Sequence, residues 1–267
     1  MMNLFKRELR QGLTGFLVWS ITLGILIFFT MSIFPSVSSS NIELNQYIKS
    51  LPTSMAKALS LNNLNMSDML SFYNSCIGIY IILCAAIYAM LFGTGIISKE
   101  INDKTVEFLQ SKPITRSSII TQKLIPRIFY VIALNMLLFL MTYFSFEHVK
   151  KSDYSIEKLL LIFIGYTIIE ITFVSLGLFL SLIIKNKKIS TNLSIWTVFG
   201  MYLLYILAGI SDKFSYLKCF TPFKYADASD IIADGKLKAV YIIILTIVNM
   251  ILIGVSYIIY NHKDISV

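Results

Sequence analysis

The chain has 267 residues, of which 56% are hydrophobic, and its mean hydropathy is +0.74. Soluble domains are about 45–50% apolar, so this composition predicts a membrane protein and argues against a soluble enzyme. The net charge of +8 alone would suit nucleic acid, but the basic residues are placed as in a membrane protein, and we expect no nucleic-acid partner.

Six apolar runs are long enough to cross a bilayer core of about 30 Å, which takes about 20 helical residues. They cover residues 16–34, 76–97, 124–146, 158–184, 193–210 and 239–260. We therefore predict an all-α, polytopic membrane protein with six transmembrane helices, organised as a single domain over residues 1–267.

The segment before the first run, residues 3–15, places Leu4, Leu9 and Leu13 among basic residues such as Lys6 and Arg10. This spacing predicts an amphipathic elbow helix that lies at the headgroup level ahead of the first span. A simple basic anchor is the alternative.

A charged segment, residues 98–127, separates the second and third runs and cannot lie in lipid. Its first half has helical spacing, with Phe108 and Leu109 on the apolar side. Pro113 ends that helix, and Thr115 is placed to cap the next one, which leads into the third span. The segment is either a docking elbow for a soluble partner or a solvated loop.

Polar residues are rare within the runs. Gly93, in the second, permits close helix packing. In the third, Arg127 is expected to snorkel to the headgroups, and Asn135 needs a hydrogen-bond partner on a neighbouring helix. Glu170, in the fourth, is the only carboxylate within the runs. It is either a substrate-path residue or a buried structural acid bonded to Asn135 or Asn249.

The segment between the fifth and sixth runs, residues 211–238, contains Pro222 and then a predicted short helix over residues 226–234, closed by a left-handed Gly235. Asp227, Asp230 and Asp234 follow helical spacing and lack a calcium-loop pattern. We interpret them as a solvated face and expect no metal site.

Charge sets the predicted orientation. If the N-terminus is inside, the inner segments hold 13 Lys/Arg and 5 Asp/Glu, and the outer segments hold 10 and 9. Since Lys and Arg favour the cytoplasmic side, we predict that both termini are inside.

Several chemistries are not supported by the sequence. No Gly-x-x-x-x-Gly-Lys motif is present, which argues against ATP binding by this chain itself. The two histidines, His148 and His262, fall on opposite sides of the membrane in this topology. We predict no catalytic residues, because the sequence lacks the paired catalytic groups that an intramembrane enzyme would need.

Two stretches carry a family resemblance. The first is Lys99-Glu100, Thr105-Val106-Glu107-Phe108-Leu109 and Ser111-Lys112-Pro113-Ile114-Thr115-Arg116, and the second is Thr221-Pro222-Phe223-Lys224-Tyr225-Ala226-Asp227. They resemble the first cytoplasmic loop and the outer re-entrant segment of type-2 ABC transporter permeases. Asp103-Lys104 replaces a glycine usual in the family's loop.

The resemblance implies a permease subunit of an ATP-driven exporter, in a bacterial cell membrane. It implies two partners, an ATP-binding subunit that holds the ATP and a second permease, either another copy of this chain or a related one, so we expect no cofactor on this chain. The coupling helix between spans 2 and 3 would touch the ATPase through Glu100, Glu107, Phe108, Leu109 and Arg116. Candidate path residues are Glu170, Asn135 and Asn249, and an ATP-independent channel or carrier is the alternative.

Overall fold

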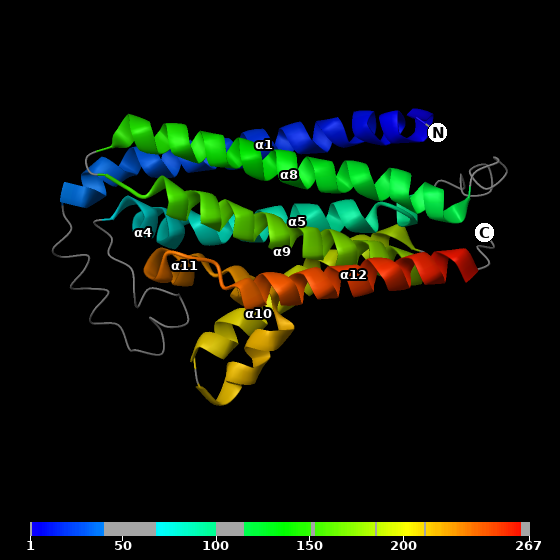
Figure 1. Ribbon diagram of the computed structural model, residues 1–267. Helices are drawn as coiled ribbons and strands as arrows, with labels where there is room; N and C mark the ends of the chain where they lie inside the picture. Colours follow the sequence, from blue (N-terminus) through cyan, green and yellow to red (C-terminus); the bar gives the residue numbers. More distant parts are fainter. Residues whose placement is uncertain are drawn as a thin grey trace.

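The computed structural model describes residues 2–39, 68–99, 115–150, 153–184, 186–210 and 212–262. The described residues form helices and their connections (Figure 1). The long helices are α1 Met2–Ser39, α5 Ile79–Thr94, α8 Arg116–Val149, α9 Ile156–Ile183, α10 Lys187–Ile210 and α12 Ala239–His262. The shorter ones are α4 Met69–Tyr73, the π-helical η1 Asn74–Gly78, the 3₁₀ segments η2 Asp212–Phe220 and η3 Pro222–Ala226, and α11 Ala228–Asp234.

Six helical segments are long and apolar enough to cross a membrane, which confirms the predicted number of spans within the described residues. The second is the continuous run α4–η1–α5, over residues 69–94. It begins at Asp68, whose side chain accepts a hydrogen bond from the Ser71 backbone N–H at 3.1 Å. Cap and apolar run together explain why this helix begins several residues before the predicted span.

The N-terminal segment differs from the prediction. A separate elbow helix is absent from the described residues, because α1 runs without a break from Met2 to Ser39. The reason lies in its contacts with α8. The Tyr130 hydroxyl donates to the Leu9 carbonyl, and a side chain at Gly12 would meet the Tyr130 ring. The first turns of α1 therefore pack against protein.

The centre of the bundle is the pair α5 and α9, whose spans are the most buried of the six candidate spans, with 56% and 61% of their apolar windows inside the protein. A Cβ at Gly93 would lie 2.4 Å from the Val174 carbonyl oxygen, and one at Gly177 would lie 2.5 Å from that of Met90. Two glycines therefore bring the backbones together, which confirms the packing role predicted for Gly93. By contrast, α10 and α12 leave large apolar side chains such as Trp196 and Met250 exposed.

Both termini lie at one end of the bundle (Figure 1). Side-chain contacts place the end of α5 and the start of α8 there too: Lys99 Nζ donates to Gln11 Oε1 at 3.0 Å, and Arg116 Nη1 donates to the Asn261 carbonyl at 3.2 Å. We call this the terminal end. The residues that precede and follow 100–114 therefore lie beside the two ends of the chain.

Candidate coupling and translocation sites

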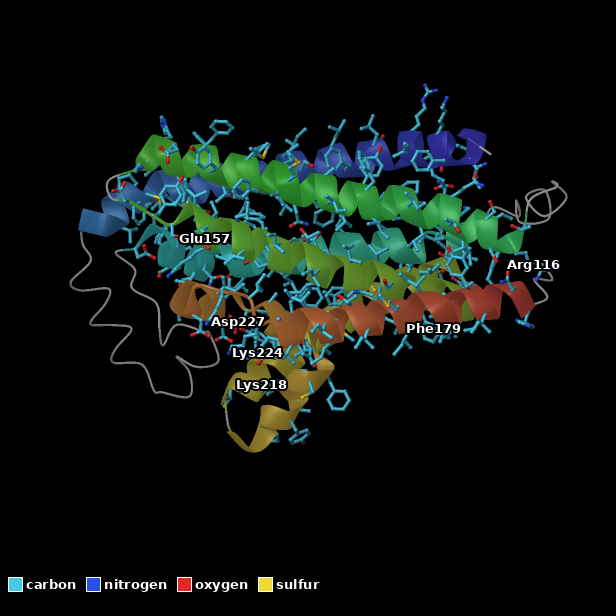
Figure 2. All side chains as sticks on the ribbon, viewed as in Figure 1. Arg116, Glu157, Phe179, Lys218, Lys224 and Asp227 are labelled. Atoms are coloured by element: carbon cyan, nitrogen blue, oxygen red, sulfur yellow. The ribbon has the colours of Figure 1, made fainter. Side chains whose placement is uncertain are left out.

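Of the predicted coupling residues, only Arg116 is among the described residues; Glu100, Glu107, Phe108 and Leu109 lie outside them. Thr115 caps α8 as predicted, because its Oγ1 accepts from the Ser118 backbone N–H at 3.3 Å. Arg116 follows and donates to the last carbonyls of α12, at 3.4 Å to Tyr260 and 3.2 Å to Asn261 (Figure 2). Such carbonyls lack partners inside their own helix, so this arginine ties α8 to α12.

Three charged side chains are buried at the terminal end, and we call them the ionic cluster: Glu8 of α1 with Lys123 and Arg127 of α8. Lys123 Nζ lies 3.3 Å from Glu8 Oε1, and Arg127 Nη2 lies 2.7 Å from Glu8 Oε2. Each side chain is at most 6% exposed. The two cations stand four residues apart on one face of α8, so a single carboxylate reaches both.

The ionic cluster also reaches α5. Lys123 Nζ donates to the Ile96 carbonyl at 3.2 Å, just after α5 ends. The Arg127 guanidinium lies 4.6 Å from the centre of the Phe92 ring, in a cation–π contact. One set of charges thus joins the start of α1, the end of α5 and the first turns of α8.

The ionic cluster is not among the features predicted from the sequence. Arg127 was expected to reach the headgroups, and that is wrong, because the residue is 5% exposed and binds Glu8. Glu8 lies within residues 3–15, the segment predicted to be an amphipathic surface helix. The sequence does contain a signal for it: two cations spaced by four, Lys123 and Arg127, stand at the start of the predicted third span, and one acid, Glu8, precedes the first span. Cations held inside a bundle need a counter-ion.

A second polar group lies on α9, inside the bundle. Glu170 is 0% exposed, and its Oε2 accepts a hydrogen bond from Asn135 Nδ2 of α8 at 2.9 Å. Asn249 Nδ2 of α12 donates to Thr172 Oγ1 at 3.1 Å. The structure therefore pairs Glu170 with Asn135, one of the two partners named for a structural acid, whereas Asn249 bonds to a different residue of α9.

These path candidates keep unused acceptors. Within the described residues, Glu170 Oε1, Asn135 Oδ1 and Asn249 Oδ1 are buried and have no hydrogen-bond partner. Buried polar atoms are bonded in the great majority of cases. Three unpaired oxygens on α8, α9 and α12 can accept hydrogen bonds from groups that enter the bundle.

The segment after α10 is fixed to the opposite end of the bundle from Arg116 (Figure 2). Asn74 Nδ2 donates to Ser229 Oγ at 3.1 Å, and Lys158 Nζ donates to the Ile232 carbonyl at 2.6 Å. The predicted short helix is α11, and Gly235 ends it in the left-handed conformation with φ 69°. Its predicted re-entry into the membrane stays a prediction.

The prediction of a solvated acidic face is wrong for Asp227. Its side chain is 8% exposed, and it caps α11 by accepting from the Ser229 backbone N–H at 3.0 Å. Lys224 Nζ lies 3.1 Å from Asp227 and 2.6 Å from Asp230. Burial lowers the pKa of Lys224, but the two carboxylates outweigh it and the net pKa is raised. A charged Lys224 therefore holds η3 to the start of α11.

A family model described as ABC-2 family transporter protein matches residues 2–265. A search of curated proteins finds no match.

Proposed function

The chain belongs to the ABC-2 transporter family, and we propose that it is the membrane subunit of an ATP-driven exporter, working as a dimer with a separate ATP-binding subunit. The family match over residues 2–265 is the observation that carries the proposal. The sequence has no P-loop motif of its own. Energy must therefore reach this chain through contact with a subunit that hydrolyses ATP.

The terminal end is the proposed docking site for that subunit. Lys99 and Arg116, which stand on either side of residues 100–114, lie there, against Gln11 of α1 and Asn261 of α12 respectively. A partner shifts a conformational equilibrium only through different affinities for the two states. Glu107, Phe108 and Leu109 are proposed to make that contact, with Glu100 and Arg116 as flanking charges.

The ionic cluster is well placed to carry movement from the docking site into the spans. Lys123 and Arg127 lie two and three turns beyond Arg116 on α8, and both are bound to α1 through Glu8. A displacement of the start of α8 would therefore move α1 and the end of α5 with it.

The proposed translocation path runs past Glu170, Asn135 and Asn249. Its support is the set of three buried acceptors without partners in the described residues. A substrate with N–H or O–H groups, or the water that accompanies it, would satisfy them. The apolar faces of α10 and α12, with Trp196 72% and Met250 68% exposed, leave room for a second permease copy or lipid.

The orientation, with the terminal end in the cytosol of a bacterial cell, is part of the proposal. It rests on the excess of Lys and Arg in the segments at that end. Single cysteines test it: Lys104→Cys and Lys187→Cys should resist a membrane-impermeant thiol reagent in intact cells, whereas Lys57→Cys should react. The labelling must be done without Cys76, Cys84 and Cys219. Labelling of Lys104→Cys in intact cells would reverse the assignment.

The functional proposal is tested by purifying the tagged chain from membranes of its own cells under mild detergent. A copurifying ATPase with P-loop sequence, whose hydrolysis rate changes when the permease is added back, is the expected result. A chain that conducts or exchanges solutes in proteoliposomes without any ATPase would instead identify a channel or carrier.

A further inference from the structure

A groove of about 560 Å³ lies between α1 and α8 on the surface of the bundle, away from the terminal end. Apolar side chains dominate its lining, and Ser145 and His148 supply the polar groups. Its size falls within the range of about 300–1,000 Å³ that is typical of small-molecule sites. The groove therefore has the capacity of a ligand site and an almost entirely apolar wall.

The groove exists because of how the two helices meet. A Cβ at Gly24 would lie 2.3 Å from Met141 Sδ, so Met141 occupies the space that this glycine leaves. On either side of that contact, large side chains stand outward: Phe28 is 54% exposed and Phe144 is 65% exposed. The contact forms a floor, and the aromatic rings form raised walls.

Both helices that form the groove are candidate membrane spans. The medium around it is hydrocarbon, and an unfilled recess there would deprive its lining of dispersion contacts. Along α1 the lining runs from Ile21 to Phe28, a rise of about 10 Å. A neighbouring transmembrane helix is itself about 10–12 Å wide and crosses about 30 Å, so it fits this short recess poorly, whereas a flexible acyl chain can enter it.

One end of the groove is polar. The centre of the His148 ring lies 6.2 Å from that of Phe28, and α8 ends at the next residue, Val149. Charged residues follow at once, with Lys150 paired to Asp153 at 3.2 Å. His148 therefore stands where the hydrocarbon gives way to the headgroups. Its imidazole N–H can donate to a phosphate oxygen, while the nearby lysine is already engaged by acids.

We propose that this groove binds one phospholipid of the leaflet opposite the terminal end, with an acyl chain against Gly24 and Met141 and the phosphate at His148. Recognition uses the phosphodiester and the chain, which phospholipids share, so it does not depend on the headgroup alcohol. The site is independent of ATP coupling and holds whether or not the chain acts as an exporter.

The test uses the full chain in nanodiscs of phosphatidylcholine containing a phosphatidylcholine with a photoreactive diazirine in one acyl chain. After illumination, cross-linked peptides are located by mass spectrometry. We expect labelling concentrated on residues 21–28 and 141–148, several-fold above the other lipid-facing segments. Even labelling over all exposed helix faces, or no labelling of residues 21–28 and 141–148, would overturn the proposal.

Two substitutions sharpen the test. Ile21→Trp fills the groove from its wall and should abolish the concentrated labelling. Met136→Trp is the matched control, because Met136 is 66% exposed on α8 and lies outside the groove lining; it should label like the parent. His148→Phe keeps an apolar ring but loses the donor, so it should lower the amount of phospholipid retained after detergent washing. If neither Ile21→Trp nor His148→Phe differs from the parent, the site does not exist.

Discussion

Among the described residues, the carboxylates of Glu8 and Glu170 are buried within the bundle, and their surroundings differ. Glu8 faces two buried cations of α8, at 3.3 Å and 2.7 Å. Glu170 receives a single amide hydrogen bond from Asn135, and its other oxygen has no partner in the described residues. The first acid compensates charge and joins three helices. The second is held by a neutral group and keeps an open acceptor. We therefore expect Glu8 to matter chiefly for structure and Glu170 chiefly for transport.

The largest effect is expected for Glu8→Gln. The change removes the counter-ion of two buried cations, and breaking a buried ion pair on one side costs about 3–5 kcal/mol. Thermal unfolding in detergent should show a large loss of stability. Glu147→Gln is the matched control, since Glu147 is a 39% exposed acid paired at 3.9 Å and its removal should cost well under about 1 kcal/mol. Equal losses of stability for the two substitutions would show that the ionic cluster contributes no more to stability than an exposed ion pair.

A smaller effect is expected for Lys123→Met. The substitution leaves Glu8 paired with Arg127, so one cation still matches one acid. The loss is the hydrogen bond to the Ile96 carbonyl and one ion-pair contact, together about 1–3 kcal/mol. The same unfolding measurement should therefore rank Lys123→Met between the parent and Glu8→Gln. A reversed order would mean that Glu8 is not the centre of the cluster.

The smallest stability effect is expected for Glu170→Gln. Glutamine keeps the side-chain shape and an oxygen that accepts from Asn135, so the loss should not exceed the net value of one neutral hydrogen bond, about 0.5–1.5 kcal/mol. Insertion and unfolding should stay near those of the parent, whereas transport rate or its pH dependence should change, since the titratable group is lost. Unaltered transport at every pH tested would make Glu170 a structural residue.

The sequence predicted features that depend on local rules. Thr115 caps α8 because a threonine before a helical run bonds its first turn, and Gly235 ends α11 because only glycine adopts positive φ without strain. The pairing of Asn135 with Glu170 was also accessible, because a buried acid in a span needs a polar neighbour and few polar residues were available.

The features that escaped prediction depend on contacts between distant segments. Glu8 and Lys123 are 115 residues apart in the sequence, with the first two predicted spans between them, so no local pattern indicates that they meet. Residues 3–15 have a residue pattern that fits both a separate surface helix and the first turns of a longer helix, so the pattern does not distinguish the two. Only packing against Tyr130 and Lys123 distinguishes the continuous α1 from an elbow. Asp227 likewise follows a sequence pattern that is typical of a solvated face. In the structure, Lys224 and the first turn of α11 enclose it.

The central claim, that a separate ATPase drives this chain through the segment between α5 and α8, is tested most directly by a doubly substituted loop, Glu107→Lys with Phe108→Ala. The measurement is ATPase pull-down together with permease-stimulated ATP hydrolysis in proteoliposomes, with Glu147→Lys at the other end of α8 as control. Each loop substitution should weaken binding by about 1–3 kcal/mol if it removes a hot-spot contact, so the double variant should insert normally yet lose the ATPase or its stimulation. A double variant that binds and stimulates the ATPase like the parent would contradict the account.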